Sequence, residues 1–247
     1  MTMNKMSCLK VLIAAAGQGT RSGLAYPKTL FPIKGKPLLI RLLNTLAPYD
    51  VMPMIIVSPN GREQIEGCLQ AHSLQAELIE QSSPKGMGDA VLKMQYSRYF
   101  NDFDDVILVW GDTVFLQGST VENLLFHHYQ DQNHFSFATR YVEKAYTKVI
   151  RHSQGQVLEL IETREQEDED LCEGERDIGL FIFKKELILA SLQQEYPLKI
   201  GKKTQEHGFL YLVKLLVSKG FKVGAYPCAS AIDLVSFNQK DDIKDYI

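Results

Sequence analysis

Residues 9–23 read LKVLIAAAGQGTRSG, an apolar run that ends in a glycine-rich turn. The run Lys10–Ala16 predicts a buried β-strand that stops at Gly17. Open parallel sheets bind ligands just beyond the carboxyl ends of their strands. Glycines in such a turn let the backbone approach an anion closely and direct successive N–H groups toward it. We therefore expect a ligand at this turn.

Two common phosphate-binding patterns do not fit it. The dinucleotide fingerprint G-x-G-x-x-G would need a glycine at Ser22 and an acidic residue about 20 positions on, and positions 37–47 contain none. The Walker A pattern ends in G-K-[ST], whereas Gly35-Lys36 is followed by Pro37. What remains is A-A-G-x-G-T-R, followed further on by Pro27-Lys28.

Short apolar runs alternate with segments of helical period through the first half of the chain, which predicts a mostly parallel sheet with crossover helices. The predicted strands cover residues 10–16, 54–57, 77–80 and 106–110, and the predicted helices cover 37–47, 62–72, 87–100 and 120–130.

The pattern changes after about residue 134. Strands that face water on one side are predicted at 134–142, 148–151 and 157–162, followed by an acidic loop or hairpin tip at 165–175. A buried strand at 178–183, helices at 184–194 and 206–218, two short strands and a terminal helix near 237–246 complete the prediction.

Composition limits the classes of function. The net charge is −3 over 247 residues, so no general basic field favours nucleic acid. The four cysteines are scattered singly, which is typical of a reducing compartment. The longest apolar stretch near the N-terminus, Val11–Ala16, is too short for a signal or membrane segment. We expect a cytoplasmic protein with no membrane partner; its oligomeric state is open.

The segment Ala15–Arg21 with Pro27-Lys28 resembles the signature of sugar-1-phosphate nucleotidyltransferases, most closely their N-acetylglucosamine-1-phosphate uridylyltransferase domains. The resemblance implies an α/β fold with a Rossmann-like, mostly parallel mixed sheet flanked by helices, and a smaller sugar-binding lobe on the same domain. It implies one nucleotidyltransferase domain over 1–247, with a nucleotide-binding half at about 1–133 and a sugar-binding, metal-completing half at about 134–247.

The same resemblance implies a set of site residues and Mg²⁺ as cofactor, with a nucleoside triphosphate (UTP above others) and a sugar 1-phosphate as partners. It assigns catalysis to Arg21 and Lys28. It assigns the nucleotide to Ala15, Ala16, Gly17, Gly19, Thr20, Gln81, Gly86 and Met87, the sugar to Thr147, Glu162 and Asp177, and the metal to Asp112 and Asn238.

Physical reasoning on these residues leads to further expectations. Gln81 offers a donor and an acceptor to a base edge. Asp112 and Asn238 supply the hard oxygens that Mg²⁺ prefers, although either residue is also a good helix N-cap. In the site without ligand, we expect the Asp112 carboxylate to lie near other acidic side chains and to have no positively charged group beside it.

Several alternatives stay open. Met87, Thr147 and Asp177 depart from the residues that are usual in the family, so the base could be thymine, guanine or cytosine, and the acceptor could be phosphocholine. A regulator that binds a nucleotide sugar without turnover is a further alternative. Because the sequence contains no hexapeptide repeat, we expect no acetyl transfer from acetyl-CoA.

Overall fold

The structure is a computed structural model that describes residues 8–17, 23–83, 85–163, 173–195, 200–201 and 205–246. Its centre is a seven-stranded sheet with the order β11-β7-β10-β6-β1-β4-β5. These strands are β1 (Leu9–Ala14), β4 (Met54–Val57), β5 (Glu77–Glu80), β6 (Asp105–Trp110), β7 (Phe135–Val142), β10 (Gly174–Lys184) and β11 (Val223–Tyr226).

The sheet is mixed but mostly parallel. β1 pairs in parallel with β4 and β6, and β10 runs antiparallel to both of its neighbours, β6 and β7. The predicted α/β class and mostly parallel mixed sheet are therefore confirmed. The strands predicted at 54–57 and 77–80 have the predicted bounds.

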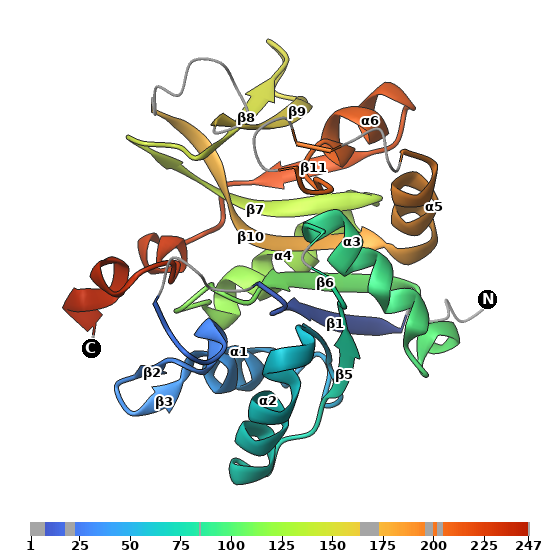
Figure 1. Ribbon diagram of the computed structural model, residues 1–247. Helices are drawn as coiled ribbons and strands as arrows, with labels where there is room; N and C mark the ends of the chain where they lie inside the picture. Colours follow the sequence, from blue (N-terminus) through green and yellow to red (C-terminus); the bar gives the residue numbers. More distant parts are fainter. Residues whose placement is uncertain are drawn as a thin grey trace.

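Helices cover both faces because successive strand residues point to opposite sides. Val11 and Ile13 pack against α1 (Leu38–Leu46), α2 (Pro59–Ala71) and α4 (Gly118–Gln130). Leu12 faces the opposite core, with α3 (Met87–Leu92), α5 (Lys185–Glu195) and α6 (Leu212–Ser218). Figure 1 shows α3 in front of the sheet and α4 behind it.

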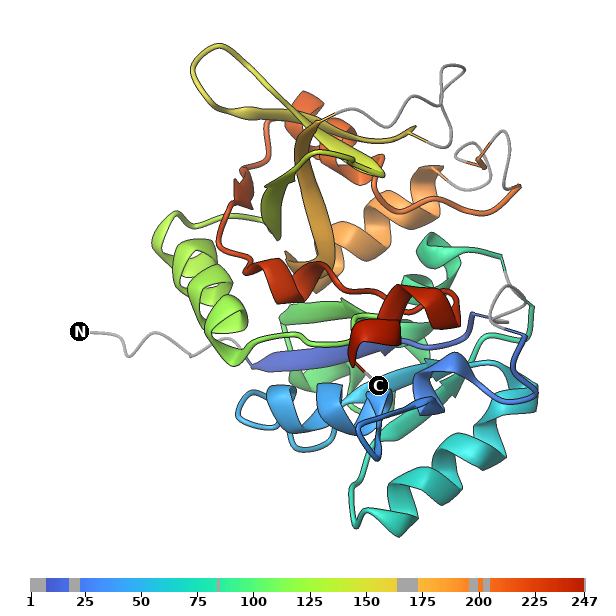
Figure 2. The same cartoon turned by 90° about the vertical axis from the view of Figure 1, so that its left-hand side faces the viewer.

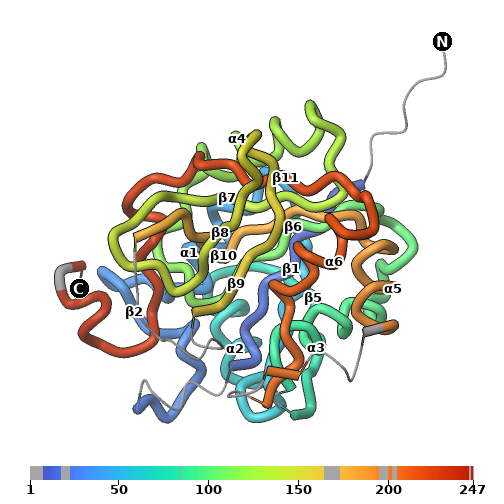
Figure 3. Tube along the Cα trace, turned by 90° about the horizontal axis from the view of Figure 1, so that it is seen from above, coloured from blue at the N-terminus to red at the C-terminus, as the bar shows by residue number. Residues whose placement is uncertain are grey.

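Two hairpins extend the sheet architecture. β2 (Pro32–Ile33) and β3 (Lys36–Pro37) are joined by Lys34 and Gly35, both with positive φ, as a type I′ turn requires. β8 (Thr147–Arg151) and β9 (Val157–Glu162) form an antiparallel pair that lies against β10 (Figure 3).

The helix predicted over 87–100 is wrong beyond Leu92. A 3₁₀ helix, η3 (Lys93–Tyr96), follows α3, and the chain then turns away. The cause is the Glu77 carboxylate on β5, which accepts hydrogen bonds from the Ser97 hydroxyl (2.5 Å) and the Arg98 N–H (2.8 Å). A short 3₁₀ turn, η4 (Phe100–Asp102), completes this region.

The helix predicted over 206–218 begins only at Leu212. Upstream of it the backbone of His207 is bound elsewhere: its N–H donates to the Lys85 carbonyl (2.6 Å) and its carbonyl accepts the Gly88 N–H (3.0 Å). These bonds hold 206–208 against α3, so the segment cannot close helical hydrogen bonds.

Three further predictions need correction. β7 is buried through Thr139 and does not face water there, because β10 and β11 flank it and both core layers cover it. Only β11 forms where two late strands were predicted, and the chain ends in the 3₁₀ helices η6 (Ala231–Leu234) and η7 (Lys240–Tyr246). Of the acidic segment at 165–175, Gly174 and Glu175 belong to β10, and 165–172 lie outside the described residues.

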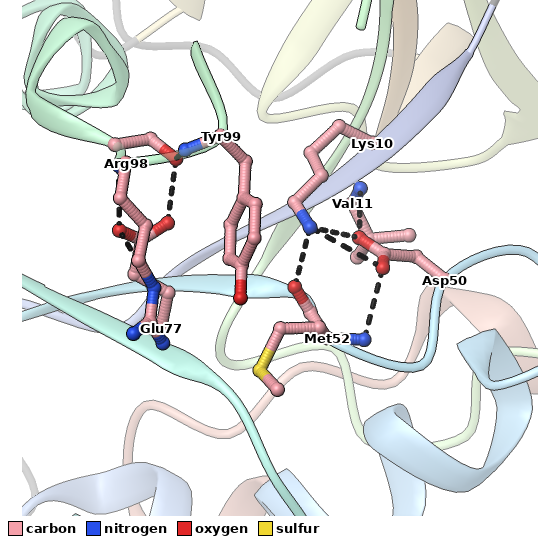
Figure 4. Close-up of polar contacts among 8 residues, drawn as sticks. Lys10, Val11, Asp50, Met52, Glu77, Arg98 and Tyr99 are labelled. Carbon is pink, nitrogen blue, oxygen red and sulfur yellow. Dashed lines mark hydrogen bonds and ion pairs between the residues drawn. The ribbon is translucent and has the colours of Figure 1, made fainter. Parts of the chain in front are cut away.

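A buried polar network ties together the amino ends of the strands (Figure 4). Lys10 Nζ donates to the Met52 carbonyl (2.6 Å) and lies 3.3 Å from an Asp50 carboxylate oxygen. Asp50 also accepts the N–H groups of Val11 (3.0 Å) and Met52 (2.9 Å). The loop before β4 is thereby fixed to β1.

The ring of Tyr99 extends this network. Lys10 Nζ lies 4.6 Å from the ring centroid, and the Arg98 guanidinium lies 5.0 Å from it. Both distances fit cation–π contacts. Because Glu77 binds the backbone of Arg98, the network connects β1 to β5 across β4. No helix in the described part of the chain is both long enough and apolar enough to cross a membrane.

His128 on α4 is buried as a neutral base. Its Nδ1 lies 2.9 Å from the Ser136 hydroxyl, and the residue is 1% exposed. Burial lowers the pKa of His128 from 6.5 to about 4; the Asp105 carboxylate opposes this shift, and Lys184 and His134 add to it.

We expect this histidine to weaken the fold in acid. Between pH about 6.5 and about 4 the unfolded chain binds a proton that folded His128 does not, so the free energy of unfolding falls as the pH falls. The full effect is about 3 kcal/mol. Urea unfolding across this range measures it for the wild type and for His128→Asn, whose amide can keep the bond to Ser136. Equal pH slopes in the two proteins would contradict this assignment.

Candidate active site

A pocket of about 760 Å³ opens at the carboxyl ends of β1 and β6. The chain leaves β1 toward β4 and β5 on one side and returns to β6 on the other, so this is the point where the strand order reverses and α/β sheets bind ligands. Figure 2 shows the C-terminal segment (red) running between the half that contains β8 and β9 and the half that contains α1 and α2.

Backbone contact between β1 and β6 shapes the floor of the pocket. The Gly111 N–H donates to the Ala14 carbonyl (2.9 Å). A Cβ at Gly111 would lie 2.6 Å from that carbonyl oxygen, so only glycine fits. Beyond β1, Ala15 N–H binds the Ile56 carbonyl, whereas the N–H groups of Ala16 and Gly17 bind no described residue. Both residues line the pocket.

A basic and an acidic side chain meet beside this floor. Lys28, in the 3₁₀ helix η2 (Lys28–Leu30), places its Nζ 2.7 Å from Asp112 Oδ2. Both side chains are less than one-fifth exposed. The expectation that Asp112 has no cation in the empty site is therefore wrong, because the turn after β1 brings Lys28 to it across 84 positions of sequence.

The C-terminal segment completes this side of the pocket. The Phe237 N–H donates to the Asp112 carbonyl (2.9 Å), and the Val114 N–H donates to the Val235 carbonyl (3.0 Å). This short pairing carries Asn238 into the pocket lining. Asp112 is not a helix N-cap, since α4 begins at Gly118.

The donor set fits a magnesium ion. A carboxylate from Asp112 and an amide carbonyl from Asn238 line one pocket, and Mg²⁺ takes few protein ligands while it keeps phosphates and waters. The Asn238 side chain makes no hydrogen bond to a described residue; the backbone N–H of Asn238 donates to the Asp242 carboxylate (2.8 Å). Among the described residues no cluster of three or more His, Cys, Asp or Glu could hold a metal, so this site would be shared with a ligand.

At another wall, Gln81 is 5% exposed and its amide donor is already used. Nε2 donates to the Gly86 carbonyl (3.1 Å) and to Asp89 Oδ2 (2.8 Å). The expectation that Gln81 offers both a donor and an acceptor is wrong, because these neighbours take both amide hydrogens and leave only the carbonyl oxygen. Met87 lines the pocket next to this amide.

The wall from the second half of the chain carries acids and hydroxyls. Asp177 accepts hydrogen bonds from the Thr147 hydroxyl (2.5 Å) and the Gly179 N–H (2.8 Å). Burial raises the pKa of the Asp177 carboxyl, an effect that these two hydrogen bonds oppose. Glu162 on β9 also lines this wall. The arrangement presents hydrogen-bond acceptors to a hydroxyl-rich ligand.

Several residues of this lining were not predicted from the sequence. The Arg176 guanidinium lies 4.9 Å from the ring centroid of Tyr146, and both line the pocket. Trp110 packs against Gly179, and its buried indole N–H meets no acceptor among the described residues. His207 lines the wall near Gln81, and burial lowers its pKa. The only sequence signal was adjacency to motif residues, which does not reveal the direction of a side chain.

Every predicted site residue within the described part of the chain reaches this pocket. These residues are Ala15, Ala16, Gly17, Lys28, Gln81, Gly86, Met87, Asp112, Thr147, Glu162, Asp177 and Asn238. Gly19, Thr20 and Arg21 lie outside the described residues. The roles assigned to them stay predictions.

Comparisons with known proteins agree with this geometry. Residues 11–178 match the family described as MobA-like NTP transferase domain. The chain is 26% identical over 237 residues to a bifunctional protein GlmU from Clostridioides difficile, covering 95% of this chain and 50% of that protein. It thus spans about half the length of the curated relatives it matches.

Two solved structures share the fold. The inositol-1-phosphate CTP transferase from T. maritima superposes with a TM-score of 0.72 at 16% identity, covering 96% of this chain and 93% of that chain. HddC from Yersinia pseudotuberculosis gives a TM-score of 0.66 at 19% identity, with 96% and 97% covered.

The ion pair between Lys28 and Asp112 yields a testable expectation. Asp112→Asn and Lys28→Ala should each lower the free energy of unfolding by about 1–3 kcal/mol, because each removes a hydrogen-bond partner from a mostly buried charged pair. The double variant should lose less than the sum of the two, since either change removes the same contact. Thermal or urea unfolding of the four proteins measures the coupling.

Asp112→Asn and Lys28→Ala should each also lower the rate of turnover about 10²–10³-fold, because each removes a charge from the pocket. Lys214→Ala is the matched control, because Lys214 makes a 2.8 Å ion pair with Glu159 and does not line the pocket. Asp112→Asn should also raise the Mg²⁺ concentration needed for half-maximal rate. Superimposable Mg²⁺ titrations of wild type and variant would remove Asp112 from the site.

Proposed function

The chain belongs to the family of MobA-like NTP transferase domains, and we propose that it transfers a nucleotidyl group from a nucleoside triphosphate to a sugar 1-phosphate. An acceptor phosphate oxygen forms a bond to the α-phosphorus, the bond between that phosphorus and the bridging oxygen breaks, and pyrophosphate leaves. The observation that carries this proposal is the Lys28–Asp112 pair in a pocket at the sheet's reversal point.

The main obstacle to this reaction is repulsion between anions. Two unit charges roughly 4 Å apart repel by about 4 kcal/mol at an effective dielectric constant near 20. Phosphoryl transfer therefore requires positioning and charge neutralisation more than covalent chemistry. Ala16 and Gly17 offer backbone N–H groups to the triphosphate, and Lys28 brings a positive charge to the same end of β1.

Asp112 and Asn238 would hold Mg²⁺ on this side of the pocket. A bound divalent cation neutralises phosphate charge and orients the triphosphate. Lys28 neutralises Asp112 in the free protein. With Mg²⁺ held by Asp112, the Lys28 ammonium would be available for phosphate oxygens in the same pocket.

Uracil is the base that we assign. The open polar atom of Gln81 is its carbonyl oxygen, since Nε2 is bound by Gly86 and Asp89. Uracil offers an N–H donor that this oxygen can accept. The resemblance to N-acetylglucosamine-1-phosphate uridylyltransferases favours the same base.

The acceptor that we assign is an amino-sugar or hexose 1-phosphate. Glu162 and Asp177 present carboxylate oxygens to sugar hydroxyls, and Thr147 holds Asp177 in place. Arg176 adds a guanidinium to this wall, which would favour an anionic acceptor.

A substrate panel tests the proposed reaction. Nucleoside triphosphates are crossed with sugar 1-phosphates and phosphocholine, and pyrophosphate release is measured. We expect the highest kcat/KM for UTP with N-acetylglucosamine 1-phosphate, and almost none for Lys28→Ala. A much better rate with CTP, dTTP or GTP would overturn the uridylyl assignment. Tight nucleotide-sugar binding without release for any pair would favour the non-catalytic alternative.

The acceptor wall yields a separate expectation. Asp177→Asn replaces one acceptor oxygen by a donor, so it should raise the KM for the sugar phosphate about tenfold and leave the KM for the triphosphate unchanged. Asp131→Asn is the control, since Asp131 accepts a hydrogen bond from Tyr226 and does not line the pocket. Steady-state kinetics with each substrate varied in turn give both constants, and an unchanged acceptor KM in Asp177→Asn would remove Asp177 from the sugar contacts.

A further inference from the structure

The amide of Gln81 can adopt only one orientation in its surroundings. Both groups next to Nε2, the Gly86 carbonyl (3.1 Å) and Asp89 Oδ2 (2.8 Å), are hydrogen-bond acceptors. A flipped amide would place its oxygen against these two oxygens and lose both bonds. The Gln81 carbonyl oxygen therefore points away from α3, and Gln81 lines the pocket.

Asp89 is the charged partner in this arrangement. It lies in the first turn of α3 and is 7% exposed. Its Oδ1 lies 3.2 Å from Lys93 Nζ, so Oδ2 is the oxygen that binds Gln81. A carboxylate this deeply buried is costly unless it is paired, and here the pairing uses one oxygen for Lys93 and the other for Gln81.

The backbone around Asp89 allows little movement. Gly86 has a φ of +100°, and a Cβ there would lie 2.5 Å from the His207 carbonyl oxygen. A Cβ at Gly88 would lie 2.3 Å from the Gly208 carbonyl oxygen. The start of α3 is thus packed directly on the 206–208 backbone, which keeps Asp89 within reach of Gln81.

We infer that Asp89 is a positioning residue for nucleotide selection, which acts by holding the Gln81 carbonyl oxygen toward the base. This inference rests on the proposed function, since it deepens the choice of nucleotide. The pocket then selects a pyrimidine that carries an N3–H, as uridine and thymidine do. In cytidine the N3 atom carries a lone pair and no hydrogen. Two hydrogen-bond acceptors, cytosine N3 and the Gln81 carbonyl oxygen, would then face each other.

The expected difference in affinity between UTP and CTP follows from the cost of leaving buried polar atoms unpaired. Two buried acceptors that face each other lose a hydrogen bond and gain repulsion, which corresponds to about a 10- to 100-fold difference in affinity. We therefore expect UTP and dTTP to bind more tightly than CTP by this factor in the wild-type protein.

The experiment measures nucleotide binding by calorimetry with Mg²⁺ and no acceptor, together with kcat/KM for UTP and CTP. In Asp89→Asn the new amide can donate to a flipped Gln81 side chain, so only the Gly86 carbonyl still favours the wild-type orientation. We expect the UTP-to-CTP preference to fall about tenfold or more. The change should appear in the Kd and KM for the nucleotide, with the KM for the acceptor unchanged.

Asp131→Asn is the matched control, because it makes the same change at a carboxylate that accepts a hydrogen bond from Tyr226 and does not line the pocket. It should keep the UTP-to-CTP ratio. A second measurement uses the wild-type protein and N3-methyl-UTP, which has no N3–H. The wild-type protein should bind this nucleotide as weakly as CTP. This measurement decides the question if Asp89→Asn fails to fold.

The outcomes separate the two proposals. Equal binding of UTP and CTP by wild type, an unchanged ratio in folded Asp89→Asn, or full binding of N3-methyl-UTP would each overturn the role of Asp89. Selective UTP binding without turnover for any acceptor would overturn the proposed reaction and leave the role of Asp89 supported.

Discussion

A short backbone pairing joins the C-terminal segment to the middle of the chain at the pocket. The bonds from Phe237 to Asp112 and from Val114 to Val235 attach the C-terminal segment to the strand end of β6. Without them Asn238 would have no fixed relation to Asp112, and the pocket would be open on that side. The position of Asn238 thus depends on backbone hydrogen bonds in which no side chain takes part.

In the pocket without ligand, the charges of Lys28 and Asp112 balance each other. A carboxylate held at a strand end, away from bulk water, is costly without a partner. Lys28 supplies that partner at 2.7 Å. The pair keeps the pocket close to neutral before ligands arrive, so neither charge has to be buried alone.

Local pattern was enough to predict much of the fold. The strands at 54–57, 77–80 and 157–162 have their predicted bounds, because short apolar runs between polar turns leave few alternatives. The family match over 11–178 confirms the resemblance that the glycine-rich turn carried. The helix predicted at 87–100 was wrong beyond Leu92 because Glu77, about 20 positions earlier, binds Ser97 and Arg98. The helix predicted at 206–218 begins late because Lys85, far earlier in the sequence, binds the backbone of His207.

The site was predictable as a set of positions but not as a set of contacts. Motif spacing brought Lys28, Gln81 and Asp112 to one place, since strand ends meet at one edge of a sheet. Which atom binds which depends on distances across the fold. The Lys28–Asp112 pair and the use of the Gln81 donor by Asp89 could therefore not be read from spacing.

The polar network of Lys10, Asp50 and Tyr99 lies at the amino ends of the strands, whereas the pocket lies at their carboxyl ends. The six residues of β1 separate the two by about 20 Å. Changes this far apart add independently in their effect on folding. Sequence drift at the rim of the pocket therefore alters which molecules fit without loosening the opposite edge, which makes the architecture tolerant of new specificities.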